Sequence, residues 1–366
     1  MPDFFKYLSI SDELKTLGEK ILNGKRVSRQ EALMLYEDAP LAWLGLLANE
    51  RKTAVSGKEV YFNRNFHIEP TNICIYKCNF CSFRRSSGED GSWELSVDEM
   101  LKQVMAKADS ATEVHIVGGV HPKYTVEYFA DFIRKIKAQA PHLHVKGFTA
   151  VEIEHMCRKS RLSVDEGLKV LKEAGLESLP GGGAEIFDAE LRKEICGEKS
   201  TSEMWLGVHR AAHLVGLPSN CTILYGHKET FEHRVDHLDR LRALQDETRG
   251  FNAFIPLKFK KANNSMESYG EVSVVEDLRN FAVSRIYLDN IPHLKAYWPM
   301  IGKDVAQLSL GYGVDDLDGT IDDSTAIYSM AGGEDKPSAS SQELIKLIED
   351  CGKIPIERDS VYNSIV

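Results

Sequence analysis

The chain has 366 residues, of which 43% are hydrophobic and 27% are charged, and its formal net charge at pH 7 is −10. This ordinary composition, without a low-complexity tract, excludes a disordered chain and predicts a folded body of enzyme size. The negative charge argues against nucleic acid as a partner, because phosphate binding needs a basic surface, and no apolar run approaches the roughly 20 residues of a membrane span.

Residues 1–65 have the pattern of helices. Ser28 followed by Glu31 forms a capping-box sequence, and Pro40 opens an apolar run. We find no chemical motif in this stretch and predict an N-terminal helical extension that covers a larger domain. Residues 1–6 lack the long apolar core of a signal peptide, so we expect a cytoplasmic protein.

From residue 66 onward, short apolar or β-branched runs alternate with amphipathic helical stretches, which is typical of a parallel sheet built from βα units. We predict eight strands, at 66–69, 113–118, 144–148, 176–180, 220–225, 251–257, 293–298 and 314–319. The helices that we predict with them span 96–108, 126–139, 163–174, 201–215, 230–248, 275–288 and 302–310.

This repeat predicts an α/β fold, a (β/α)8 TIM-type barrel over residues 66–320, or at least a partial barrel of six units with additional elements. A C-terminal tail, 321–366, is expected to pack on the barrel, with its last helix at 341–351. Such barrels carry their chemistry on the loops that follow the strands, so the motifs in those loops are the candidates for function.

Three of the seven cysteines follow the first predicted strand with the spacing Cys74-x3-Cys78-x2-Cys81. A disulfide set does not suit an odd number of cysteines in a reducing compartment. A zinc site normally has four ligands, and no second cysteine pair follows, although His67 is a candidate fourth ligand. Iron–sulfur clusters normally take four thiolates, so the spacing favours a 4Fe-4S cluster with one iron left open. Zinc and unliganded thiols remain the alternatives.

The cysteine spacing, with Phe80 directly before Cys81, resembles the radical S-adenosylmethionine (radical SAM) superfamily. This resemblance implies that S-adenosylmethionine binds the open iron through its amino and carboxylate groups. It also implies that an electron from the cluster cleaves the sulfonium C–S bond and yields a 5′-deoxyadenosyl radical. An external electron donor such as flavodoxin or ferredoxin is then required. The polar stretch 85–92 is either a lid that excludes water or a loose loop.

The resemblance also suggests the contacts to S-adenosylmethionine. Gly118 and Gly119 occupy the position that contacts the methionine amino group, but Val120 replaces the usual acidic third residue. Glu185 follows three glycines that permit positive φ, and it is placed to accept hydrogen bonds from ribose hydroxyls. The alternative for Glu185 is a simple turn with an exposed carboxylate. Glu229 ends a loose form of the GxIxGxxE pattern, which shapes the adenine pocket.

Longer runs resemble one group in this superfamily, the aminofutalosine synthases of the futalosine route to menaquinone. They lie at 67–74, 115–122, 146–153, 180–186, 224–227, 315–320 and 356–359. The resemblance implies radical addition of the adenosyl group to 3-[(1-carboxyvinyl)oxy]benzoate, with rearrangement and decarboxylation, to give 6-amino-6-deoxyfutalosine. Dehypoxanthine futalosine cyclase and deazaflavin-cofactor synthases share some of these runs and remain alternatives.

A dianionic benzoate requires apolar walls for the ring and cations for the carboxylates. We expect His67, His121 and Lys295 to lie near this substrate as catalytic residues. A single histidine in a strand is more often a satisfied core residue, so each of these histidines has a structural alternative. The other cations available for a carboxylate are Arg84, Arg85, Lys146 and Arg285.

Overall fold

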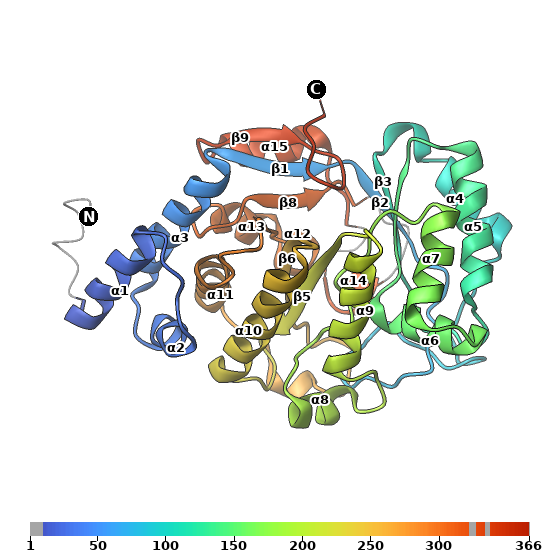
Figure 1. The fold of residues 1–366 in the computed structure, drawn as a ribbon, viewed down its shortest axis with the longest axis horizontal. Coiled ribbons are helices and arrows are strands. Elements are labelled where there is room, and N and C mark those ends of the chain that lie inside the picture. The colour runs from blue at the N-terminus through green and yellow to red at the C-terminus, as the bar shows by residue number, and fades with distance from the viewer. Residues whose placement is uncertain (1–9, 322–326, 334–336, 366) are drawn as a thin grey trace.

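The computed structural model describes residues 10–321, 327–333 and 337–365. Residues 1–9 of the predicted extension, and residues 322–326, 334–336 and 366 of the predicted tail, lie outside the described residues. Figure 1 shows the strands in the middle of the molecule, with helices along their outer side. Among the described residues, no helix combines the length and the apolar character needed to cross a membrane.

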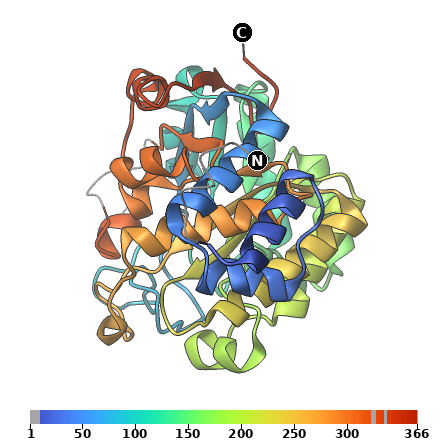
Figure 2. The same ribbon diagram turned by 90° about the vertical axis from the view of Figure 1, so that its left-hand side faces the viewer.

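The predicted N-terminal helices are present as α1 (Asp12–Leu22), α2 (Arg29–Glu37) and α3 (Leu41–Ser56). Each begins where the sequence offers a start signal. The side chain of Ser11 caps α1, Ser28 and Glu31 form the capping box of α2, and Pro40 precedes α3. The three helices gather on one side of the molecule, as Figure 2 shows.

Nine strands form three parallel sheets of three strands each. The first sheet has the order β8 (Asp316–Gly319), β1 (Glu59–Asn63), β9 (Ile354–Glu357). The second has the order β2 (Asn65–Ile68), β3 (Glu113–Ile116), β4 (His144–Gly147), and the third β5 (Ser219–Tyr225), β6 (Phe251–Lys258), β7 (His293–Leu294).

Isolated parallel bridges link the three sheets. The second sheet is joined to the third through Lys146 with Ser178 and Leu179 with Ser219. The third is joined to the first through Lys295 with Asp316. The strands β1 and β2 follow one another in the chain with a single residue between them. Parallel pairing therefore continues from β2 through to β8 and returns to β1.

The remaining helices follow the strands, as the βα pattern predicts. In chain order they are α4 (Val97–Met105), η2 (Ala108–Ser110), α5 (Val126–Gln139), α6 (Ala150–Ser160), α7 (Val164–Ala174), α8 (Ala189–Cys196), α9 (Ser202–Leu214), α10 (Phe231–Thr248), η3 (Glu267–Tyr269), α11 (Val274–Tyr287), α12 (Trp298–Ile301), α13 (Lys303–Ser309), α14 (Ile327–Met330) and α15 (Ser341–Glu349).

Several elements differ from the sequence predictions. The fourth predicted strand, 176–180, is reduced to two bridged residues, because Pro180 lacks an N–H and the glycines after it favour a turn. The sequence predictions missed α6 and α8, although the capping box of Thr149 and Glu152 was available as a signal for α6. They also missed β1 and β9, which pair with each other from opposite ends of the chain.

A buried ion pair fixes the C-terminal strand to the rest of the fold. The guanidinium of Arg358, fully buried just after β9, donates from Nε to Asp316 on β8 at 2.7 Å. The ring of Tyr362 lies 4.4 Å from the Arg358 guanidinium carbon. Both ends of the described chain therefore pack against the strands that carry one side of the candidate site.

Candidate active site

A cavity of about 350 Å³ lies among the strands and the loops that follow them. Most of the residues predicted for the site line it, namely Cys74, Cys78, Cys81, Gly118, Gly119, Glu185 and Lys295. The sequence places these residues on five separate segments, and the parallel sheet brings them together. The cavity wall is mainly apolar, with side chains that include Leu224, Ile255, Leu257 and Phe259.

Backbone hydrogen bonds fold the cysteine loop back on itself. The N–H of Cys74 donates to the carbonyl of Arg85 at 3.0 Å, and the N–H of Arg85 donates to Asn72 at 2.8 Å. Asn79 fixes the other side of the loop, because its backbone N–H donates to Ile195 at the end of α8 at 2.8 Å. The segment 72–85 is thus held at both sides even though it has little regular structure.

The surroundings of the three thiols suit a cluster of iron and sulfide. Burial raises the pKa of Cys74 and of Cys81, while backbone N–H groups beside each sulfur oppose this rise. A hydrogen bond with Cys196 and burial raise the pKa of Cys78. The Lys199 ammonium lowers the pKa of all three thiols. N–H donors and a cation beside buried sulfurs are what charged thiolate ligands need.

No three cysteine, histidine or carboxylate side chains already converge on one metal position within the described ranges. Binding of a cluster therefore requires the cysteine side chains to rearrange within their loop. The donor set itself fits, because three thiols from one short loop line a single cavity.

Sequence reasoning did not single out Lys199, which is prominent in the structure. Its ammonium forms an ion pair with Glu185 and lies 5.7 Å from the centre of the Phe80 ring. Burial alone would lower the pKa of Lys199, but the Glu185 carboxylate raises it above its usual value. The local sequence Gly197-Glu-Lys-Ser200 carries no signal for this role, since the contact joins segments that are distant from the cysteine loop in sequence.

The backbone at Glu185 is held in a conformation that few residues adopt. Its φ is +50°, in the left-handed region. Arg192 on α8 donates to the carbonyls on both sides of it, Ala184 at 2.6 Å and Ile186 at 3.2 Å. The carbonyl of Glu185 accepts from the N–H of Leu224 at 2.8 Å. These bonds fix the carboxylate at the cavity wall.

The two glycines of the loop after β3 are required by close packing. A Cβ on Gly118 would lie 2.8 Å from the carbonyl oxygen of Thr71, and a Cβ on Gly119 would lie 2.4 Å from that of Ile73. The Glu152 carboxylate accepts from the N–H of Gly118 at 3.2 Å. This buried carboxylate, which the sequence predictions did not assign to the site, has its pKa raised by burial to about 7.

Three predicted residues lie outside the cavity lining. Glu229 is enclosed beside Arg234, with Oε1 2.6 Å from Nη2, and it accepts from the N–H of Gly226 at 2.6 Å. His121 lies 3.4 Å from Glu94, and His67 lies 3.4 Å from His115, whose ring does line the cavity. The structure therefore places Glu229, His121 and His67 behind the lining, where they contact residues other than a bound ligand.

The far part of the cavity is polar and contains two buried ion pairs. Lys146 donates to Glu113 at 2.6 Å, and Lys295 donates to Asp318 at 2.9 Å. All four side chains line the cavity. Of the additional cations predicted for a carboxylate, Lys146 and Arg84 line the cavity, whereas Arg285 is committed to Asp315 at 2.6 Å.

Two families match the sequence. Residues 68–241 match the Radical SAM superfamily, and residues 248–365 match the CofH/MqnC C-terminal region. An aminodeoxyfutalosine synthase of Thermus thermophilus is 43% identical, with 95% of each chain covered. One of Streptomyces coelicolor is 41% identical, covering 95% of this chain and 93% of the relative.

A related protein and a solved structure extend the comparison. A cyclic dehypoxanthine futalosine synthase of Streptomyces coelicolor is 36% identical, covering 97% of this chain and 89% of the relative. The crystal structure of methylornithine synthase superposes with a TM-score of 0.72 at 16% identity, covering 93% of this chain and 97% of that one. At this identity the superposition supports the α/β fold alone.

Proposed function

Because the chain belongs to the radical SAM superfamily, we propose that it catalyses aminodeoxyfutalosine synthesis for menaquinone formation. In this reaction the 5′-deoxyadenosyl group of S-adenosylmethionine adds to 3-[(1-carboxyvinyl)oxy]benzoate, and rearrangement and decarboxylation give 6-amino-6-deoxyfutalosine. The observation that carries the proposal is the 43% identity to an aminodeoxyfutalosine synthase over 95% of both chains. The mainly apolar cavity beside three cysteines supports it.

We assign Cys74, Cys78 and Cys81 as the ligands of the 4Fe-4S cluster. When bound, the cluster supplies the electron that cleaves the sulfonium C–S bond of S-adenosylmethionine. The loop supports this role because it presents the thiols to one cavity and surrounds them with N–H donors and Lys199. The reducing electron would come from an external donor such as a flavodoxin or ferredoxin, and we place the reaction in the cytoplasm.

Around S-adenosylmethionine, Gly118 and Gly119 would present the backbone of their loop, and Glu185 would accept hydrogen bonds from the ribose hydroxyls. Glu185 already accepts a charged hydrogen bond from Lys199, so its carboxylate is held in one orientation. For Glu229 we propose an indirect role, since its enclosed carboxylate fixes the turn after β5 through Gly226 and Arg234.

Near the aromatic substrate we assign Lys295, whose ammonium lines the cavity. His67 and His121 would act through their neighbours. His67 supports the ring of His115, and His121 holds Glu94 at 3.4 Å. The apolar wall would exclude water from the reacting carbon, which a radical reaction requires.

We further propose that the linked parallel pairings close an eight-stranded (β/α)8 barrel. The continuous segment β1–β2 would be the first strand, and the bridged residues 178–179 would be the fourth. On this proposal the extension covers residues 1–65, the barrel 66–320 and the tail 321–366. The first strand then begins at Glu59, a few residues before the predicted limit of the barrel.

A single anaerobic turnover tests the function against its main alternative. Reduced enzyme with S-adenosylmethionine and the enolpyruvyl benzoate should give a product whose mass contains the adenosine unit. A cyclic dehypoxanthine futalosine synthase, a relative at 36% identity, is the alternative, and a hydrogen-abstracting enzyme of that kind would release free 5′-deoxyadenosine. Iron and sulfide assays on anaerobically purified protein test the cluster separately, and a zinc-containing, colourless protein would contradict it.

A further inference from the structure

Two lysines with very similar surroundings lie in the polar part of the cavity. Lys146 on β4 and Lys295 after β7 are 5% and 2% exposed, and both line the cavity. Each is held by one carboxylate, Glu113 at 2.6 Å and Asp318 at 2.9 Å. The two carboxylates fix the ammonium groups in place, so neither lysine has to be ordered when a ligand arrives.

Both ammonium groups keep donors available for a ligand. An ammonium has three N–H donors, and among the described residues each of these lysines makes a single hydrogen bond. Burial lowers the pKa of Lys146 and Glu113 opposes this, while the positive charge of Lys295 lowers it further. The two cations are thus close enough to repel one another, and an anion placed between them would relieve that repulsion.

The lysine pairs lie at the opposite end of the strands from the cysteines. Glu113, the partner of Lys146, is the first residue of β3 and is paired with Asn65, the first residue of β2. The cysteine loop leaves from the other end of β2. The four residues of β2 span about 10 Å at 3.3 Å per residue, so the cavity has an anionic-ligand end and a cluster end.

We propose that Lys146 and Lys295 together bind the ring carboxylate of the aromatic diacid substrate. The inference rests on the proposed function, which requires the vinyl carbon to face the 5′ carbon of S-adenosylmethionine at the cluster end. The ring carboxylate is the group of this substrate most distant from the vinyl carbon, so it points toward the lysines. The aromatic ring then lies between apolar side chains that include Ile255 and Leu257.

Ligand binding by the anaerobic holoenzyme tests this assignment. The probe is 3-(1-carboxyethoxy)benzoate, a diacid without the reactive double bond, and its partner is 2-phenoxypropanoate, which lacks the ring carboxylate. Wild-type enzyme should bind the diacid about 10- to 100-fold more tightly, because a charged hydrogen bond is lost with the ring carboxylate. Equal dissociation constants for the two probes would overturn the assignment.

Variants locate the effect. Lys295→Met and Lys146→Met should each weaken diacid binding by about 10- to 100-fold and change binding of 2-phenoxypropanoate by less than about threefold. Lys258→Met is the matched control, because Lys258 also forms a buried pair, with Asp277 at 2.7 Å, but neither residue lines the cavity. Unchanged diacid binding in Lys295→Met would exclude this lysine from the carboxylate site.

Binding of S-adenosylmethionine to each variant shows whether the cavity is still folded. If Lys295→Met loses this binding too, Lys295→Arg replaces it, since arginine keeps the charge and the pair with Asp318. The inference then requires Lys295→Arg to restore the preference for the diacid. Turnover separates the two proposals. Lysine-dependent diacid binding without an adenosine-containing product would refute the proposed function and leave the carboxylate site standing.

Discussion

Arg192 is a buried residue that shapes the wall of the cavity without lining it. Its guanidinium donates to the carbonyls of Gly183, Ala184 and Ile186 in the glycine-rich loop, and to Ser200, the neighbour of Lys199. One side chain therefore positions both members of the Glu185–Lys199 pair. A fork of five N–H donors is suited to this task, and a lysine ammonium is not.

We expect Arg192→Lys to weaken S-adenosylmethionine binding about 10-fold, because Glu185 loses the support that holds its unusual backbone conformation. Isothermal titration of the anaerobic holoenzyme measures this. Iron content should match that of the wild type, since Arg192 makes no contact with the cysteine loop among its hydrogen bonds within the described residues. An unchanged affinity would show that the loop holds its form without Arg192.

The cluster assignment predicts a sharp difference between cysteines. Cys78→Ala should lose the cluster and all turnover while the fold is retained, because two thiolates cannot hold the cluster in place of three. Iron and sulfide assays with far-ultraviolet circular dichroism measure both effects. Cys351→Ser is the control, since Cys351 is exposed and lies outside the cavity lining. Full iron content in Cys78→Ala would refute the assignment.

Glu152 predicts a pH dependence of stability. Burial raises its pKa from 4.5 to about 7 in the folded state. The folded protein therefore holds this proton more tightly than the unfolded chain, so the carboxyl favours folding at low pH and loses that contribution as the pH rises from about 4.5 to about 7. From about pH 5 to about pH 8, this contribution falls by on the order of 2 kcal/mol.

The variant Glu152→Gln cannot titrate, so it isolates this contribution. The unfolding free energy of the wild type minus that of Glu152→Gln should decrease by the stated amount over this pH range, as measured by urea denaturation. A difference that is constant with pH would mean that Glu152 ionises at its ordinary pKa in the folded protein.

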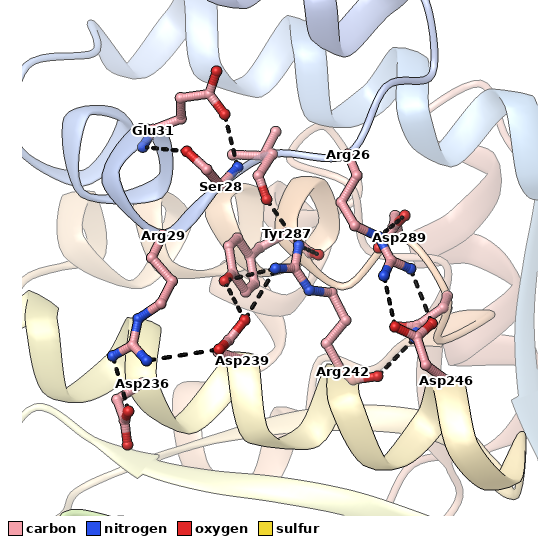
Figure 3. Close-up of polar contacts among 12 residues, drawn as sticks. Arg26, Ser28, Arg29, Glu31, Asp236, Asp239, Arg242, Asp246, Tyr287 and Asp289 are labelled. Atoms are coloured by element: carbon pink, nitrogen blue, oxygen red, sulfur yellow. Dashed lines mark hydrogen bonds and ion pairs between the residues drawn. The ribbon is translucent and has the colours of Figure 1, made fainter.

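At the scale of elements, ion pairs join the N-terminal helices to α10. Figure 3 shows Arg29 directed at Asp236 and Asp239, while Arg26 reaches Asp246. These pairs are partly exposed. Beneath them, Arg242 of α10 is buried and donates to the carbonyl of Val27 at 2.8 Å and to the hydroxyl of Tyr287 at 2.8 Å.

Burial decides which of these contacts stabilises the extension. We expect Arg29→Ala to cost less than about 1 kcal/mol, because its side chain is 53% exposed and screened by water. Arg242→Ala should cost about 3 kcal/mol, since it leaves buried acceptors without a donor. Urea denaturation measures both, and added salt should reduce only the effect of Arg29. Equal costs would contradict the importance of burial.

At the scale of the whole molecule, the two ends of the sequence share one sheet. The pairing of β9 with β1, and of Arg358 with Asp316, connects the C-terminal segment to the strand that carries Asp318 of the cavity. The cavity floor therefore depends on a residue that lies 40 positions beyond it in sequence.

Arg358→Met should destabilise the protein by about 3–5 kcal/mol, because it leaves the Asp316 carboxylate buried without its cation. Thermal unfolding should nevertheless remain a single transition, since the N-terminal, central and C-terminal segments share their strands. Calorimetry measures both. Two separate transitions in the wild type would indicate that the C-terminal segment folds as an independent unit.

The sequence alone determined the local features of this protein. The spacing of Cys74, Cys78 and Cys81 indicated a radical SAM enzyme, and capping residues with apolar periodicity located most helices and strands, because both signals depend on neighbours within a few positions. Only the tertiary structure decided the partners. It placed Lys199 beside Glu185, paired Lys146 and Lys295 with carboxylates, and withdrew Glu229 from the cavity. These contacts join residues from separate strands and helices, so no local pattern encodes them.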